Sequence, residues 1–126
     1  MSQHSEKLEM GMTVRRQVLG DDHVDAAVAA TSDVDRDFQE WITANVWGDL
    51  WSRPGLGQRD RSLITIALLA AAGHEELKLH LKAARNTGAT REEIVETLLH
   101  VAVYAGVPAA NSAFKTMKQI YEENPD

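Results

Sequence analysis

The stretch DRSLITIALLAAAG, residues 60–73, is the most apolar part of the chain. After Ser62 it is apolar on nearly every side, and Gly73 is a typical residue at a helix C-terminus. Spanning a bilayer takes about 20 apolar residues, so this stretch is too short for a membrane helix. We therefore expect a buried central helix, against which the other elements pack.

Helix signals recur on both sides of this stretch. Ser32 or Asp33 is suited to cap one helix, Thr90 and Glu93 form a capping-box pattern, and Pro108 favours a helix start. Residues 1–12 carry no periodic pattern, and we expect them to be flexible. No alternating strand pattern occurs, so the sequence predicts an all-α bundle of about six helices, forming one domain over residues 13–126. The other expected helices are 22–30, 33–48, 75–86, 90–105 and 109–121.

The composition is that of an ordinary globular protein, with 126 residues, 44% apolar and 25% charged. The absence of cysteine excludes disulfides, thiolate metal sites and thiol catalysis. The net charge of −6 argues against nucleic-acid binding. Because the N-terminal residues lack the apolar core of a secretory signal, we expect a cytoplasmic protein without membrane contact.

Charge is unevenly distributed along the chain. Residues 20–49 contain eight acidic residues and one arginine, whereas residues 53–91 contain seven basic and three acidic residues. A basic segment in an acidic chain suits a small anionic ligand or an acidic neighbouring subunit. Two solvated helix faces of different charge would explain the pattern equally well.

Two carboxylate–imidazole pairs have helical spacing. Glu76 and His80, like Glu96 and His100, stand four residues apart and would share a helix face. Such a pair suits general acid–base catalysis, although helix-stabilising pairs of this kind are common. His80 lies among leucines on a helix that must pack on the central one, so its ring is expected to be partly buried. The spacing and the lack of further carboxylates make a metal site a weak alternative.

Arginines and aromatic residues form a second set of candidates. Arg53 and Arg61 flank a Pro-Gly loop before the central helix, and Arg15 lies near the N-terminus. Arginine binds carboxylates through paired hydrogen bonds, although many surface arginines are simply solvated. We interpret Trp47 and Trp51 as walls of a pocket or interface, with a core position as the commoner alternative.

Taken together, these motifs resemble the carboxymuconolactone decarboxylase family over residues 11–118. The resemblance implies an all-helical fold shared with alkylhydroperoxidase D relatives and a homo-oligomer, either a trimer or a hexamer. In those relatives a Cys-x-x-Cys pair precedes a histidine; if His80 matches it, Gly73 and Glu76 occupy the cysteine positions, and peroxidase chemistry is excluded. The motifs are 14–20, 47–56, 59–63, Glu76 with His80, and 99–111.

The activity implied by the resemblance is cofactor-free loss of carbon dioxide from a dicarboxylate lactone, 4-carboxymuconolactone, in protocatechuate catabolism. No metal is implied. His80 would donate a proton, oriented by Glu76, with other residues binding substrate. Two alternatives remain at this point: a non-catalytic binding or assembly module on the same fold, and an isomerase or hydrolase of a related lactone. The implied substrate-binding residues are Arg53, Arg61, Arg15, Trp47, Trp51, His100 and Tyr104.

Overall fold

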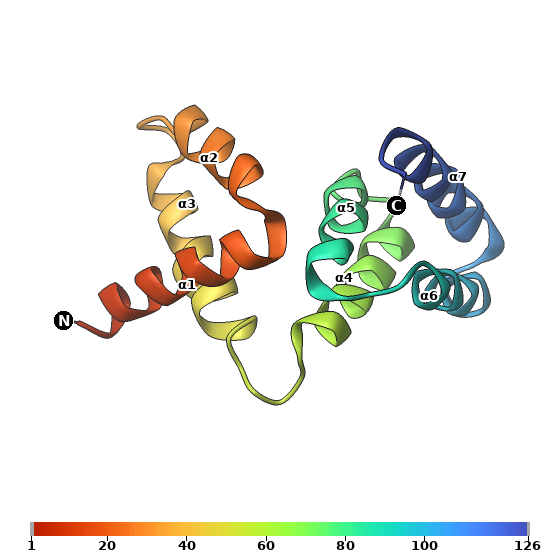
Figure 1. Cartoon of the computed structure of the whole chain (residues 1–126), viewed down its shortest axis with the longest axis horizontal. Coiled ribbons are helices and arrows are strands. Elements are labelled where there is room, and N and C mark those ends of the chain that lie inside the picture. Colours follow the sequence, from red (N-terminus) through yellow and green to blue (C-terminus); the bar gives the residue numbers. More distant parts are fainter. Residues whose placement is uncertain (1, 126) are drawn as a thin grey trace. The chain divides into compact units, whose positions relative to one another are not determined.

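The computed structural model describes residues 2–125, and this part of the chain is all-helical, as the sequence predicted. It contains seven α-helices and one π-helical segment, close to the six helices expected. The helices form two compact units, one ending at Gly57 and the other beginning at Gln58 (Figure 1). That residues 13–126 act as one domain stays a prediction.

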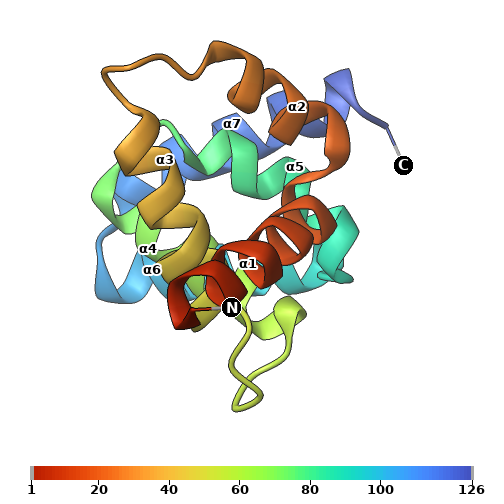
Figure 2. The same ribbon diagram turned by 90° about the vertical axis from the view of Figure 1, so that its left-hand side faces the viewer.

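Unit 1 is built around the contact between its first and last helical segments. Figures 1 and 2 both show α1 crossing η1, while α2 follows α1 directly. A loop over residues 51–57 follows η1. The elements of unit 1 are α1 (Gln3–Leu19), α2 (Asp21–Ala30), α3 (Arg36–Ile42) and the π-helical segment η1 (Thr43–Leu50).

Two glycines allow α1 and η1 to touch through their backbones. A Cβ atom on Gly11 would lie 1.8 Å from the carbonyl oxygen of Thr43. A Cβ atom on Gly48 would lie 2.0 Å from the carbonyl oxygen of Lys7. No side chain fits at either distance, so both positions require glycine.

The stretch over residues 1–12, which shows no periodic pattern in the sequence, is helical from Gln3, where α1 begins. That this stretch is flexible stays a prediction. Its N-terminus is capped by Ser2, whose hydroxyl accepts a hydrogen bond from the Ser5 N–H at 3.1 Å. Lys7 forms an ion pair with Asp49 of η1 at 3.0 Å. The segment lacks an apolar period because it contacts η1 through its backbone, and an amphipathic pattern does not reveal such a contact.

The helix expected to end near Gly48 instead continues through it. The α-helical part stops at Ile42, and η1 carries the chain to Leu50, where the Trp51 N–H donates to the Val46 carbonyl at 2.9 Å. Gly48 does not stop the helix because it serves the close approach to α1. π turns of this kind occur frequently at functional sites.

Unit 2 is a four-helix arrangement in which α4 contacts the other three helices, as expected of a central helix. Ser62, Ile66 and Ala70 are its buried residues, spaced four apart along one stripe. This stripe and the apolar faces of the other helices form one continuous core. The elements are α4 (Gln58–Ala72), α5 (Leu77–Thr87), α6 (Arg91–Tyr104) and α7 (Val107–Glu123).

Helix α4 is not buried on nearly every side, contrary to the sequence expectation. Ile64 and Leu68 are 47% and 66% exposed in this chain, and Val103 of the adjacent α6 is 76% exposed. The reason is geometric, because three neighbouring helices cover only part of a helix surface. Unit 2 therefore carries an apolar face in addition to its core. No described helix is long and apolar enough to cross a membrane.

The predicted capping box at the start of α6 is confirmed. The Thr90 hydroxyl accepts from the Glu93 N–H at 3.1 Å, and one carboxylate oxygen of Glu93 accepts from the Thr90 N–H at 2.9 Å. The other carboxylate oxygen forms an ion pair with Arg59 of α4. Glu93 thus links the cap of α6 to the first turn of α4.

Replacing Gly11 with alanine should destabilise the protein by about 2–4 kcal/mol, because the new methyl group overlaps the backbone of η1. Alanine normally stabilises a helix relative to glycine, so the sign is reversed here. Urea unfolding measures the change. Gly57→Ala is the matched control, since a methyl group there meets nothing within 4 Å. Equal stability of the two variants would contradict the close contact.

Glu93→Gln should cost less than about 1 kcal/mol, because glutamine can still complete the capping box while the half-exposed ion pair is lost. Glu93→Ala removes both interactions and should cost about 1 kcal/mol more. Urea unfolding in wild-type and Arg59→Met backgrounds separates the two contributions. If the cost of Glu93→Gln is the same in both backgrounds, the ion pair contributes nothing.

Candidate functional site

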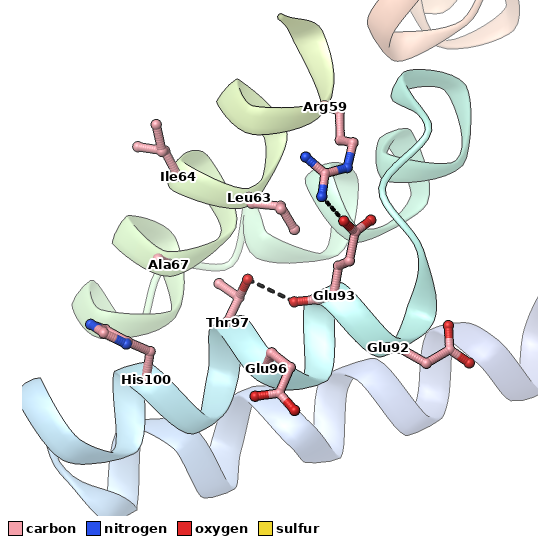
Figure 3. A pocket seen from close by; sticks show the side chains of 9 residues that line it. All are labelled: Arg59, Leu63, Ile64, Ala67, Glu92, Glu93, Glu96, Thr97 and His100. Atoms are coloured by element: carbon pink, nitrogen blue, oxygen red, sulfur yellow. Dashed lines mark hydrogen bonds and ion pairs between the residues drawn. The ribbon is translucent and has the colours of Figure 1, made fainter. Parts of the chain in front are cut away.

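A groove of about 540 Å³ runs between α4 and α6 on the surface of unit 2. Figure 3 shows its apolar wall on α4, with Arg59 and Glu93 at one end and His100 at the other. The wall residues of α4 are Leu63, Ile64 and Ala67, and Thr97 of α6 lies opposite. The groove therefore presents this apolar wall between a charged end and an end formed by an imidazole.

The arginine at the charged end of this groove is already paired with carboxylates. Arg59 pairs with Asp60 at 2.6 Å and with Glu93. At the other end the rings of His100 and Tyr104 stack with centroids 4.9 Å apart and planes 21° apart. Glu96 makes no described hydrogen bond to His100, and its carboxylate points away from α4 (Figure 3). The second carboxylate–imidazole pair is thus not formed in this chain.

His80 is one of four buried polar or charged residues among those described, and it is 7% exposed. It shares the buried face of α5 with Leu77, Leu81 and Ala84, which belong to the core of unit 2. The expected burial of the ring therefore follows from helical periodicity. An imidazole held in this way keeps a fixed orientation, which suits a proton donor.

Glu76 is placed differently from its expected position inside a helix. It is the exposed N-cap residue of α5, and its carbonyl accepts from the His80 N–H at 3.2 Å. Its own N–H donates to Nδ1 of His74 at 3.1 Å. Gly73, at φ +65°, makes the turn into this segment. The described contacts join Glu76 to His80 through the backbone.

The arginines predicted to bind substrate lie in three environments. Arg53 is exposed in the loop after η1, and Arg61 is half-buried in α4. Arg15 of α1 is only 6% exposed. Its two terminal nitrogens donate to Thr43 Oγ1 and Gln39 Oε1, both at 3.1 Å.

Burial lowers the pKa of Arg15 below its ordinary value, because a charged group loses hydration there. The guanidinium lines a pocket of about 380 Å³ within unit 1. Arg15 is therefore a buried cation held by neutral groups beside a cavity.

Trp47 and Trp51 pack against each other at the end of η1. Their ring centroids are 5.0 Å apart, and each residue is 6% exposed. The Ser52 hydroxyl donates to the Trp47 carbonyl at 2.7 Å and closes this end of the segment. Such burial agrees with the core alternative that the sequence left open.

Gln39 and Thr43 are site residues that sequence reasoning missed. Their spacing of four places both on one helix face, but nothing in the sequence connects that face to Arg15, which stands 24 and 28 residues earlier. Among residues 2–125, no three His, Asp or Glu side chains gather as metal ligands would.

Comparison with known proteins gives consistent results. The model of the carboxymuconolactone decarboxylase family matches residues 36–119, from α3 into α7. The chain is 42% identical to the 4-carboxymuconolactone decarboxylase of Acinetobacter baylyi, over 94% of this chain and 89% of that protein. It is 40% identical to a nitrosuccinic acid decarboxylase of Metarhizium robertsii, over 87% of this chain and 78% of the relative.

A third relative, the 4-carboxymuconolactone decarboxylase of Pseudomonas putida, is 46% identical over 35% of this chain and 92% of that sequence. The family match covers most of the chain, and the Acinetobacter relative aligns over nearly all of it. The all-helical structure agrees with the fold that the sequence motifs implied. This chain belongs to the carboxymuconolactone decarboxylase family.

Proposed function

We propose that this protein decarboxylates 4-carboxymuconolactone to the 3-oxoadipate enol-lactone, in protocatechuate catabolism. The observation that carries the proposal is the 42% identity over 94% of the chain to the Acinetobacter enzyme of that name. The compartment proposed for this reaction is the cytoplasm.

The chemistry of this substrate requires few catalytic groups. The departing carboxylate is on a ring carbon conjugated with the lactone carbonyl through the ring double bond. When carbon dioxide leaves, the electron pair of the broken bond enters a dienolate, and a proton is then added to the ring carbon next to the carbonyl. The substrate therefore serves as its own electron sink, and we propose that the protein needs no cofactor.

In this proposal His80 donates the proton, and Glu76 orients it or relays the proton. The buried position of His80 on α5 supports a positioned donor. Arg53, Arg61 and Arg15 bind carboxylate groups. Their better target is the acetate arm, because tight binding of the departing carboxylate would stabilise the ground state and raise the barrier. The aromatic residues Trp47, Trp51 and Tyr104, with His100, are proposed to complete substrate binding.

A second candidate substrate class comes from the Metarhizium relative, which is named for decarboxylation of nitrosuccinic acid. Loss of carbon dioxide beside a nitro group also delivers the electron pair of the broken bond to a conjugated acceptor, the nitro group, and gives a nitronate. Nitrosuccinate and the lactone are both compact dicarboxylates that carry their own electron sink. The two candidates differ in the acceptor, a nitro group or a lactone carbonyl.

Carbon dioxide and enol-lactone should form from 4-carboxymuconolactone generated in situ, above the spontaneous rate, with chelator and without added cofactor. His80→Ala should lower kcat by about 10²–10⁴-fold through loss of the proton donor. His100→Ala is the matched control and should mainly affect KM. Near-normal turnover by His80→Ala would contradict the assignment. Release from nitrosuccinate alone would move the proposal to the second substrate class.

We further propose that the protein is a homo-oligomer, a trimer or hexamer, assembled in part through the apolar face of α4 and α6. Val103→Glu should reduce the mass measured by light scattering, because a charge there opposes burial of that face. Lys118→Glu, at an exposed site of α7, is the control and should leave the mass unchanged. A monomeric wild-type protein, or an unchanged mass for Val103→Glu, would contradict this proposal.

A further inference from the structure

We propose that the pocket of unit 1 is a carboxylate-binding site anchored by Arg15. The inference extends the role given to Arg15 above, and it rests on the proposed function only for the choice of a carboxylate as the anion. The pocket lies entirely within unit 1. Its ligand binding can therefore be measured without catalysis.

The first argument is the unused hydrogen-bonding capacity of Arg15. A guanidinium has five N–H donors, and the described bonds of Arg15 engage two of them, one on Thr43 and one on Gln39. Its Nε is buried without a hydrogen-bond acceptor. Both acceptors are neutral, so the guanidinium has no ion pair within unit 1. A buried cation in this state is stabilised when an anion enters the pocket.

The second argument is the contrast with neighbouring arginines. Arg16 pairs with Asp21 at 2.9 Å and with Asp25 at 2.8 Å, and these hydrogen bonds raise its pKa. Arg36 pairs with Asp33 at 2.6 Å. Carboxylates are thus abundant in unit 1, yet none is within ion-pair distance of Arg15. Unlike Arg16 and Arg36, Arg15 has no carboxylate partner within unit 1, so its guanidinium can pair with the carboxylate of a ligand.

The third argument is the chemistry of the pocket wall. The volume of about 380 Å³ suits a small organic molecule. The lining combines apolar residues with hydroxyl and amide groups, and it includes Arg36 and Glu40. The net charge of the lining is only +1, which favours a single carboxylate on an apolar body over a phosphate dianion. The apolar residues are Leu8, Met12 and Val28, and the polar ones are Thr31, Gln39 and Thr43.

The position of the two acceptors also favours a carboxylate. Gln39 and Thr43 hold the two terminal nitrogens from one helical face, so the guanidinium plane is fixed. A fixed guanidinium can present parallel N–H groups to both oxygens of a carboxylate. Gln39 and Thr43 are positioning residues in this site, and Arg15 is the group that touches the ligand.

The test uses benzoate as the probe and benzamide as its uncharged counterpart, titrated into the full-length protein. Benzoate should bind saturably and shift the amide NMR signals of residues around Arg15, Gln39 and Thr43. Benzamide should bind about tenfold more weakly or worse, because the charge-assisted hydrogen bonds are lost. Equal affinity for the two probes, or shifts confined to unit 2, would overturn the proposal.

Two neighbouring substitutions give a matched comparison that keeps Arg15 in place. Gln39→Glu puts a carboxylate where the amide oxygen now lies 3.1 Å from Arg15, so it should weaken benzoate binding about tenfold or more while preserving the melting temperature. Glu40→Gln removes a negative charge from the same pocket, and it should bind benzoate equally or more tightly. Unchanged affinity for Gln39→Glu would overturn the proposal.

Carbon dioxide release measured on the same preparations separates this inference from the proposed function. Turnover without benzoate binding in unit 1 would overturn the carboxylate site alone. Benzoate binding that Gln39→Glu weakens, without turnover of either candidate substrate, would support the site while contradicting the decarboxylase proposal.

Discussion

The backbone contact between α1 and η1 is the constraint on which unit 1 depends. Gly11 lies against the carbonyl group of Thr43, and Arg15 follows Gly11 by four residues on the same face of α1. The contact that excludes a side chain at Gly11 therefore also brings the guanidinium to the Thr43 hydroxyl. The packing requirement at Gly11 and the proposed ligand-binding group of Arg15 therefore lie about one helical turn apart on α1.

In unit 2 the central element is α4, which has one face buried in the core and one apolar face exposed. The stripe containing Ile66 and Ala70 completes the core, as expected for the most apolar helix of the chain. The opposite side leaves Ile64 and Leu68 exposed beside the groove that ends at His100. A helix with more apolar surface than the other helices of its unit cover is typical of a subunit that associates with others.

The polar groups of the protein fit a reaction that relies on its substrate for electron withdrawal. Each unit buries one ionisable group of the proposed machinery, the imidazole of His80 in unit 2 and the guanidinium of Arg15 in unit 1. One can supply a proton and the other can hold an anion. Two relatives named for different decarboxylation substrates have similar identity to this chain. Both names describe the loss of carbon dioxide, and they differ in the substrate.

The sequence by itself determined the helical class, the place of the central helix and the cap at Thr90, because periodicity and capping patterns are local properties of the chain. It also predicted the burial of His80, since that residue occupies the apolar face of α5. Its motifs were enough to indicate the family.

Only the tertiary structure decided what depends on contacts between distant segments. The close approach at Gly11 and Gly48 exists only because α1 meets η1, and it involves a segment with no periodic pattern in the sequence. Thr43 and Gln39 became partners of Arg15 for the same reason. The expected pair of Glu96 and His100 is not formed, because helical spacing alone does not decide which way two side chains point. Local patterns predict elements, whereas the pairing of their side chains follows from how the elements pack.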